Sequence, residues 1–596
     1  MKEIPHTKAL GPITLFLLSV PVGVVSGLGA VVFRGLIAFF HNLFFLGKIS
    51  VLYDANVHTP VSPWGPFVIL VPVLGALGVA FLVKNFAPEA KGHGVPEVMD
   101  AIYYNNGIIR PIVAVIKSVA SALSIGSGGS IGREGPIIQI GSSFGSTLGQ
   151  ILRIPVWQRI TLIAAGAGGG IAATFNTPIG GVLFAVEIML HEFSVRTLVP
   201  VAISTATATY IGRIFFGPHP SFVVPSFETP YFHITNPLVL FSYVGLGVIM
   251  GVVSAIYIKS IYRFEDFFEK RVRGNYYTRH MIGMFLVGII MYLLMSAKGY
   301  YYIEGVGYST IQDVLSRTLS QLDLLLILFI LKLITTSLTL GSGASGGIFS
   351  PALYMGATLG GAYGIILNQL FPGLSIDPPA FAVAGMAGVV GGATGAAMAA
   401  IVMIFEMTLD YSVIIPMTIT VALSYGIRRM LSKESIYTLK LVRRGHYLPE
   451  ALQANPQQLK RAMDVMDTQF VAVPAFSTPD EFMHIVSEQS AASYFLIKDI
   501  NQIIGVVTKD SIPKVIGQVG KPIKLGDIAS KNFVIVEEKT TLSEVIARMQ
   551  SSQASVALVT HDTGSASVDN VKGLITKQQI ADAIVQTMEM FSDYQG

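Results

Sequence analysis

The sequence predicts an all-α membrane domain with many helices, followed by a smaller part of class α+β that is built as a pair of modules. Charged residues make up 13% of the 596 residues, against about 25% in ordinary soluble domains. They are unevenly spread, because 28 of the 76 lie in 451–596 and leave the first 450 residues about 11% charged. Each part also repeats itself internally. These three observations separate a charge-poor domain, 1–445, from a domain of ordinary polarity, 446–596.

The composition excludes several classes of protein. The chain has no cysteine, which excludes a disulfide scaffold, a zinc-cysteine site and a cysteine nucleophile. Hydrophobic residues make up 52%, too many for a disordered chain, and the net charge of +4 is too small to indicate nucleic-acid binding. The zinc-protease motif and the Walker loop are absent. We therefore expect no enzyme, no required cofactor and no nucleic-acid partner.

Long stretches without a charged residue predict the spanning helices. Such a helix needs about 20 mostly apolar residues, because about 30 Å of hydrocarbon is crossed at 1.5 Å per residue. The stretches are 13–33, 66–83, 137–152, 160–186, 197–212, 238–258, 281–297, 333–376, 378–405 and 411–427. The first is too long for a signal-peptide core and is expected to be retained. Several are broken by Gly and Pro, which predicts half-helices that meet at membrane depth.

Lys and Arg predict the orientation of the chain. Basic clusters lie at 153–159, 270–279 and 428–444. By the positive-inside rule these clusters face the cytoplasm. Since the last cluster leads directly into 446–596, we expect the C-terminal part and both termini to be cytoplasmic.

The membrane part contains an internal duplication. The stretch GSGGSIGREGP at 126–136 returns as GSGASGGIFSP at 341–351, an offset of 215. Pairs at this offset are Gly126/Gly341, Ser127/Ser342, Gly128/Gly343, Gly132/Gly347, Pro136/Pro351, Gly141/Gly356, Gly145/Gly360 and Gly149/Gly364. Gly166/Gly385 and Glu187/Glu406 follow at an offset of 219. We predict two related halves, about 10–217 and about 235–430, in the inverted arrangement that transporters commonly use.

The C-terminal part is duplicated as well. DVMDTQFVAV at 464–473 matches DIASKNFVIV at 527–536, and Thr478 and Thr541 keep the same offset of 63. Each copy has the pattern strand, helix, strand, strand, helix over about 60 residues. We therefore expect two modules, at about 460–517 and about 523–588.

Three motifs interrupt the apolar pattern of the membrane part. They are named here by their sequences: the GHGVP motif (92–96), the GREGP motif (132–136) and the GIFSP motif (347–351). Glycine permits sharp turns and proline suits the first helical turn, so a helix is expected to begin at each motif. Helix starts carry free N–H groups and a partial positive charge. Several starts aimed at one point would bind an anion weakly, without a lysine.

The three motifs, their order, the duplication and the C-terminal pair resemble the CLC family of chloride channels and chloride/proton antiporters. The C-terminal pair resembles tandem CBS domains. The resemblance extends from about residue 10 to about residue 590. It implies a homodimer in the lipid bilayer with one pathway in each subunit, through which chloride or a similar small anion passes.

The resemblance makes Glu134 the gate of this pathway. At a helix start, its carboxylate would occupy an anion site until protonation or voltage displaces it. A charged residue in a membrane segment costs about 2.5–3.5 kcal/mol on insertion scales, so a functional role is the first hypothesis. The alternative is a first-turn glutamate that only stabilises its helix. Arg133 and Gly135 would supply backbone N–H groups to the outer anion site, and Ile348 and Phe349 would supply them to the central site.

The resemblance also implies that Tyr437 and the GHGVP motif contact the anion. The Tyr437 hydroxyl is a neutral donor that suits weak binding, and the alternative is an aromatic anchor at the membrane edge. His93 departs from the family, which usually has serine there. Either its imidazole donates to the anion and makes passage depend on pH, or it is turned aside and backbone groups such as that of Gly94 line the site. The preferred anion is left open by this departure.

A second departure lies at Ile188. Family antiporters usually carry a glutamate at this position of FAVEIM (184–189) as the internal proton relay, and isoleucine cannot carry a proton. This favours a channel, which conducts chloride without exchanging it for protons. The alternative is an antiporter with another internal route, for which His191 and Glu192 are candidates. Glu187 has Glu406 as its counterpart in the other half, which favours a structural role for both.

The CBS pair raises the question of an adenine nucleotide. The usual pattern ends in an aspartate that holds ribose hydroxyls, but here Ser511 and Gln579 occupy that position. Thr508 and Thr576 of the pattern are present, and Asp510 lies one place early. Nucleotide binding and a purely structural role are both left open. A further alternative for the whole chain is a membrane sensor whose output is the CBS pair and whose pore is vestigial.

Overall fold

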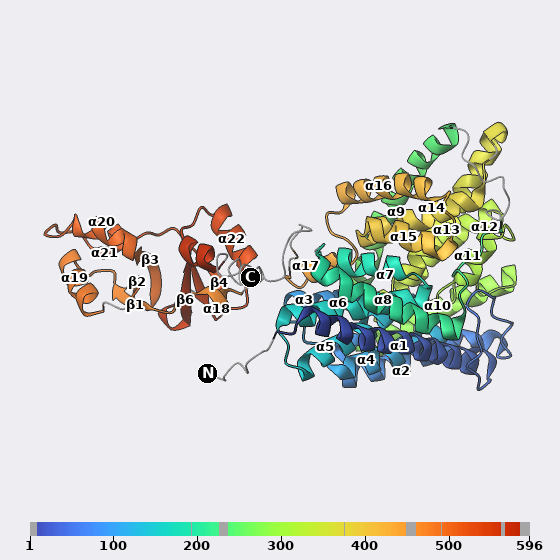
Figure 1. The fold of residues 1–596 in the computed structure, drawn as a ribbon, viewed down its shortest axis with the longest axis horizontal. Coiled ribbons are helices and arrows are strands. Elements are labelled where there is room, and N and C mark those ends of the chain that lie inside the picture. Colours follow the sequence, from blue (N-terminus) through green and yellow to red (C-terminus); the bar gives the residue numbers. More distant parts are fainter. Residues whose placement is uncertain are drawn as a thin grey trace. The chain divides into compact units, whose positions relative to one another are not determined.

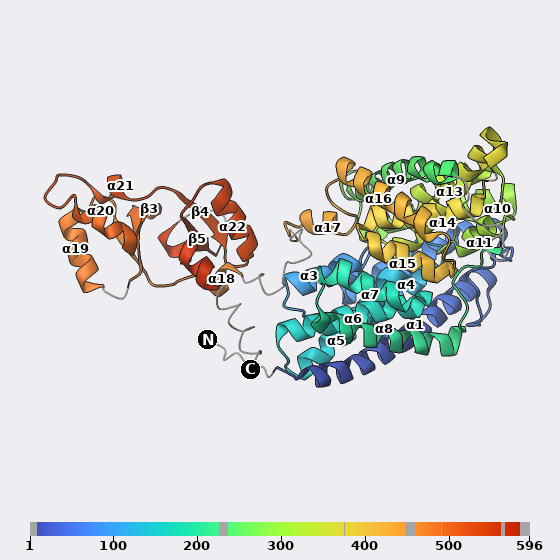
Figure 2. The same cartoon turned by 45° about the horizontal axis from the view of Figure 1, so that its top comes forward.

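The structure is a computed structural model that describes residues 9–191, 193–225, 237–374, 376–446, 448, 461–489, 492–561 and 567–583. The chain divides into two compact units, Met1–Gln453 and Ala454–Gly596. Figures 1 and 2 show that the first unit is built from helices and that the second contains the strands.

The helices of the first unit follow one order twice. The first series is α1 (Pro12–Leu46), α2 (Val71–Phe86), α3 (Val95–Tyr103), α4 (Pro111–Gly126), α5 (Glu134–Ile151), α6 (Val156–Phe175), α7 (Pro178–Phe184) and α8 (Val195–Phe216). The second is α9 (Pro237–Lys270), α10 (Tyr276–Lys298), α11 (Tyr308–Leu315), α12 (Leu322–Ser342), α13 (Phe349–Leu370), α14 (Pro378–Thr394), α15 (Ala397–Thr408) and α16 (Ile414–Leu431). A short helix, α17 (Thr438–Val442), follows. Short helices occupy corresponding positions in the two series: α3 corresponds to α11, and α7 corresponds to α15.

Six helices in the described ranges are long and apolar enough to cross a membrane. They are α1, α2 with the turn before it, α8, α9, α10 and α12. Three of the long charge-free stretches cover two helices each. Stretch 333–376 contains the end of α12 and the whole of α13, and it is broken at Gly343, with φ of 120°. Stretch 160–186 is broken after α6, where Asn176 adopts a left-handed conformation with φ of 59°, and stretch 378–405 is broken at Gly395, with φ of 81°. The Pro and Gly signals of these stretches mark breaks within the membrane unit.

The repeated glycines lie where helices cross. A Cβ atom on Gly166 would lie 2.1 Å from the carbonyl oxygen of Gly141, so α5 and α6 pack backbone against backbone. In the second half, a Cβ atom on Gly385 would lie 2.3 Å from the carbonyl oxygen of Gly356, at the crossing of α13 and α14. The duplicated spacing is therefore a spacing of close helix contacts, which need residues without side chains.

Two glutamates join the halves reciprocally. Glu406 on α15 accepts the backbone N–H groups of Ile179 and Gly180, at 3.1 and 2.7 Å, where α7 begins. Glu187 accepts those of Met398 and Ala399, at 3.3 and 2.8 Å, where α15 begins. Each carboxylate thus caps the helix start of the opposite half, where free N–H groups and the helix dipole favour a negative charge.

Replacing Glu187 with leucine should lower the stability of the membrane unit by about 1–3 kcal/mol, because two N–H groups at the start of α15, one of them part-buried, lose their charged acceptor. Thermal unfolding of the purified chain in detergent measures the change. Glu406→Leu should have a similar effect, and Glu89→Leu at an exposed position serves as the control. Unchanged stability in both Glu187→Leu and Glu406→Leu would contradict a capping role.

The second unit contains two sheets of equal topology. The first copy comprises β1 (Phe470–Pro474), α19 (Pro479–Glu488), β2 (Tyr494–Asp499), β3 (Gln502–Thr508) and α20 (Ile512–Ile516). The second comprises β4 (Phe533–Glu537), α22 (Leu542–Ser551), β5 (Val556–Thr560) and β6 (Val571–Thr576), followed by helical residues 577–583. In each sheet the first pair of strands is parallel and the second is antiparallel. Thr478 and Thr541 cap α19 and α22.

The two sheets share a hydrophobic core. Leu496 on β2, Leu558 on β5 and Leu574 on β6 belong to one buried cluster. Since neither sheet would bury this face alone, the copies stabilise each other as one unit. The predicted α+β pair is confirmed.

Candidate functional site

The three motifs meet at the contact between the two halves of the membrane unit. Gly132 and Gly347 exchange backbone hydrogen bonds of 2.8 and 2.6 Å. The N–H of Gly92 donates to Ala344 at 2.9 Å, and the N–H of Gly346 donates back to Gly92 at 3.3 Å. These pairings hold the segments that precede α3, α5 and α13 beside one another. Helix starts from both halves therefore come together, as expected from the motifs.

Glu134 is the first residue of α5 and is 2% exposed. Its Oε1 accepts hydrogen bonds from the hydroxyl groups of Ser350, in a short contact, and of Tyr308, at 3.3 Å. Tyr308 and Ser350 also share a hydrogen bond of 2.8 Å. The second carboxylate oxygen of Glu134, Oε2, has no hydrogen-bond partner among the described residues. The carboxylate is thus enclosed by the first half's own helix start and by two residues of the second half.

Glycine makes this enclosure possible. A Cβ atom on Gly132 would lie 2.0 Å from Oε2 of Glu134, and one on Gly347 would lie 2.6 Å from the same oxygen. Both distances are far below van der Waals contact. The free carboxylate oxygen therefore lies in a gap between the two motifs that only glycine backbone leaves open.

Sequence reasoning missed Tyr308 and two buried lysines. Lys117 on α4 and Lys332 on α12 are fully buried and stand at the repeat offset of 215. Each ammonium group donates to carbonyl groups of the loop before a short helix, α3 or α11. The acceptors are Ala90 and Gly92 for Lys117, and Ile303 and Gly305 for Lys332. The pattern Gly305-x-Gly307, which repeats Gly92-x-Gly94, is the signal that could have located Tyr308 at a helix start.

His93 and Tyr437 lie near each other, with ring centroids 6.0 Å apart. Both are buried, at 3% and 2% exposure. Nε2 of His93 lies 3.4 Å from the hydroxyl of Tyr262, and its Nδ1 has no partner among the described residues. Tyr437 lies outside α16, which ends at Leu431, and directly precedes the short α17.

The remaining motif residues flank the Glu134 carboxylate. Arg133 precedes α5 and stacks its guanidinium on the Tyr308 ring, 5.0 Å from the centroid. Gly135 lies against Gly94, since a Cβ atom on Gly135 would be 3.2 Å from the Gly94 nitrogen. Ile348 precedes α13, and its carbonyl accepts a hydrogen bond of 3.0 Å from Tyr257.

Phe349, the first residue of α13, is buried at the same helix start. Its ring lies 5.5 Å from the ring of Phe175, at the end of α6. The GIFSP motif is therefore fixed in place by packing against the first half of the membrane unit.

Ile188 is buried in a π-helical turn, residues 185–190, that follows α7. The nearest candidate for another proton route is His191, whose Nδ1 lies 2.8 Å from the hydroxyl of Tyr103. Glu192 lies outside the described residues. The titratable side chain of His191 therefore lies directly after the π-helical turn that contains Ile188, and it contacts the last residue of α3.

The two threonines considered for a nucleotide are hydrogen-bonded within their own modules. The Thr508 hydroxyl shares a hydrogen bond of 3.0 Å with that of Ser511. The Thr576 hydroxyl donates to Gln579 in a short contact, and Gln579 donates to Tyr494 at 2.6 Å. Asp510 lies in a single helical turn, residues 509–511. Ser511 and Gln579, which replace the usual aspartate, therefore engage the two threonines.

Comparisons with known proteins agree with this arrangement. The family model described as voltage gated chloride channel matches residues 75–429, and the CBS domain model matches residues 525–586. The H(+)/Cl(-) exchange transporter ClcA of Yersinia pseudotuberculosis serotype IB (strain PB1/+) is 32% identical over 440 residues, which are 72% of this chain and 88% of that protein. ClcA of Salmonella arizonae is 31% identical over 72% of this chain and 89% of its own.

Solved structures of the same kind share the fold. A slow cyanobacterial Cl−/H+ antiporter is 26% identical, with a TM-score of 0.63 over 73% of this chain and 99% of its own. A eukaryotic CLC transporter, 19% identical, matches the fold over 95% of this chain and 98% of its own, with a TM-score of 0.60.

The membrane unit and its convergent helix starts define an integral membrane protein of anion transport rather than an enzyme. The chain belongs to the CLC family of voltage gated chloride channels and transporters, with a C-terminal CBS domain.

Proposed function

We propose that the chain passes chloride across the membrane along a path between the starts of α3, α5 and α13, and that Glu134 is the gate. The observation that carries this proposal is the position of the Glu134 carboxylate. It is buried between Gly132 and Gly347 of opposite halves, with one oxygen bonded to hydroxyl groups and the other without a partner among the described residues. A halide ion would fit the same surroundings.

The proposed gate works by competition between two negative charges. Helix starts attract anions through free N–H groups and a partial positive charge, so the carboxylate and chloride favour the same place. Protonation removes the charge of Glu134 and with it this attraction. The side chain then leaves, and the hydroxyl and N–H groups are free to receive chloride. His93 and Tyr437 would line the next site along the path, and Ile348 and Phe349 would present backbone groups to it.

We propose that passage is channel-like, because the buried Ile188 cannot bind a proton. In proteoliposomes loaded with chloride, the protein should release chloride without measurable opposite movement of protons, which a pH-sensitive dye detects. Ile188→Glu serves as the comparison, since it restores a titratable group at this position. Proton uptake in fixed proportion to chloride release by the unmodified chain would contradict the channel mechanism. The absence of any chloride flux would favour a sensor with a vestigial pore.

The second candidate is a proton/chloride antiporter. The relatives named above are exchange transporters, and the slow cyanobacterial antiporter is of the same kind. The hydrogen bond between His191 and Tyr103 provides a titratable side chain near Ile188, from which such a route would start. If protons move with chloride, His191→Gln should reduce proton movement more than chloride movement.

We propose further that the protein is a homodimer with one path in each subunit and that both termini are cytoplasmic, following the family. The CBS pair is proposed to have a structural role. The hydrogen bonds of Thr508 and Thr576 within their own modules support this choice over nucleotide binding.

A further inference from the structure

A cavity of about 210 Å³ lies next to the Glu134 surroundings. Its walls include Arg133, which directly precedes Glu134 in the sequence, and Tyr308, which donates a hydrogen bond to the Glu134 carboxylate. No residue of the GHGVP motif lines it, and neither does Tyr437. The cavity is therefore separate from the His93–Tyr437 region and is contiguous with the gate.

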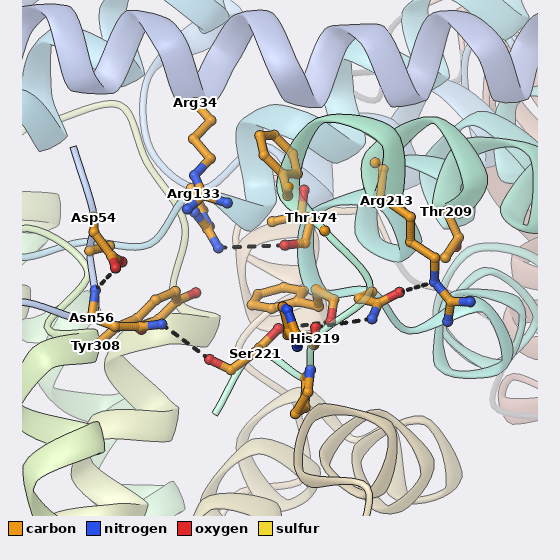
Figure 3. A pocket seen from close by; sticks show the side chains of 18 residues that line it. Arg34, Asp54, Asn56, Arg133, Thr174, Thr209, Arg213, His219, Ser221 and Tyr308 are labelled. Atoms are coloured by element: carbon orange, nitrogen blue, oxygen red, sulfur yellow. Dashed lines mark hydrogen bonds between the residues drawn. The ribbon is translucent and has the colours of Figure 1, made fainter. Parts of the chain in front are cut away.

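Positive charge dominates the walls of the cavity. Figure 3 shows Arg34 extending from α1 toward Arg133, and the two charges are near enough to act on each other. Arg213 on α8 also lines the cavity, where its Nε donates to Asn176 at 2.6 Å. Among the described residues that line the cavity, Asp54 is the one acidic residue. Three guanidinium groups thus face a single carboxylate.

The guanidinium groups of the two arginines near the gate lie over aromatic rings. The guanidinium of Arg34 lies 4.4 Å from the ring centroid of Phe216, and that of Arg133 stacks on Tyr308. Arg133 is 8% exposed, and its Nε has no partner among the described residues. Within the same ranges no ion pair joins Arg34 or Arg133 to Asp54. Arg34 and Arg133 are like charges close enough to act on each other, and the buried Nε of Arg133 lacks a partner among the described residues, so a small anion in the cavity would stabilise both guanidinium groups.

We propose that this cavity is an additional anion-binding site, in which the side chains of Arg34 and Arg133 hold a small inorganic anion before it reaches Glu134. The part that concerns passage rests on the function proposed above. The site differs in chemistry from the path beyond it, because fixed guanidinium charges replace backbone N–H groups.

The dimensions and charge of the cavity suit a waiting anion. A water molecule takes about 30 Å³ of liquid volume, so the cavity has room for a chloride ion that keeps part of its hydration. A concave surface of one charge sign raises the local concentration of the opposite ion and its rate of entry. Arg34 is only partly buried, so water screens its attraction and the anion is released readily.

Chloride currents across bilayers in which all chains share one orientation test the proposal. Arg34→Gln should raise the chloride concentration for half-maximal flux about fivefold when chloride is varied on the cavity face, because about 1 kcal/mol of attraction is lost. The chloride concentration for half-maximal flux from the opposite face, and the maximal flux itself, should change less than about twofold, because Arg34 does not contact the path beyond Glu134 in this proposal. Arg34→Lys should retain most of the unmodified affinity. Lys48→Gln, which removes an exposed charge from the loop after α1, is the matched control.

Three results would overturn or redirect the proposal. Equal half-saturation in Arg34→Gln and Lys48→Gln would overturn it. A shifted pH dependence with unchanged half-saturation would also overturn it, since Arg34 would then receive the displaced Glu134 carboxylate. If the unmodified chain passes no chloride, the proposed function fails, and the cavity is tested separately by calorimetric titration of the full chain with sulfate, which guanidinium groups bind in a bidentate manner. Heat lost in Arg34→Gln would support the site, and equal heat would contradict it.

Discussion

Replacing Glu134 with glutamine should raise chloride flux at pH 7 about tenfold and make it nearly independent of pH. Helix starts stabilise a nearby negative charge by up to about 2 kcal/mol, and glutamine carries none, so the side chain no longer holds the anion site. In the unmodified chain, flux should rise as the pH falls, because protonation of Glu134 has the same effect as the substitution. Chloride efflux from proteoliposomes between pH 4.5 and 8 measures both quantities.

The control for this experiment is Glu89→Gln, a substitution at an exposed glutamate that pairs with Arg110. It should leave both the rate and the pH profile unchanged. If Glu134→Gln folds normally and retains the pH profile of the unmodified chain, Glu134 is a helix-stabilising residue and not the gate. A second check is Ser350→Ala, which removes one donor to the carboxylate and should favour opening at a higher pH.

Replacing Gly385 with valine should prevent the membrane unit from folding. The new Cβ atom would lie 2.3 Å from the carbonyl oxygen of Gly356 and 3.1 Å from the Cα atom of Gly360. Backbone atoms of two packed helices cannot move aside as a flexible side chain does, and overpacking of a core costs about 1–3 kcal/mol or more. The expected result is loss of the monodisperse peak when the purified chain is examined by size-exclusion chromatography in detergent.

Gly426→Val on α16 is the matched control, because its Cβ atom would meet nothing within 4 Å. Gly166→Val should be as damaging as Gly385→Val, since Gly166 makes the equivalent crossing with Gly141 in the first half. A Gly385→Val protein as stable as the Gly426→Val control would show that the two helices are less closely packed than the structure has them. An effect at Gly385 without one at Gly166 would show that the halves are not equivalent.

Much of the fold followed from spacing in the sequence. The offset of 215 between the GREGP and GIFSP motifs predicted two related halves, and the structure repeats the helix order from α1–α8 in α9–α16. The position of Glu134 at a helix start followed from the Gly and Pro around it. The order of strands and helices in each copy of the CBS pair was also readable locally. The helix start and the strand order depend on residues close together in the chain, and the repeat is found by comparing two such stretches.

The surroundings of Glu134 could not be read in the same way. Its hydrogen-bond donors, Tyr308 and Ser350, are 174 and 216 positions away in the chain. Lys117 and Lys332 keep the repeat offset of 215, but a lone basic residue in an apolar helix indicates neither its acceptor nor the side it faces, and the same holds for Arg34.

The sequence by itself determined that the chain is a duplicated membrane protein with helix starts suited to anions, because periodicity, glycine spacing and charge depletion are local properties of the chain. Only the tertiary structure decided that these starts meet across the two halves, that Glu134 lies between Gly132 and Gly347, and that a cationic cavity adjoins it. The physical reason is that electrostatic competition acts over a few ångströms, and such distances are set by packing of helices that are hundreds of residues apart.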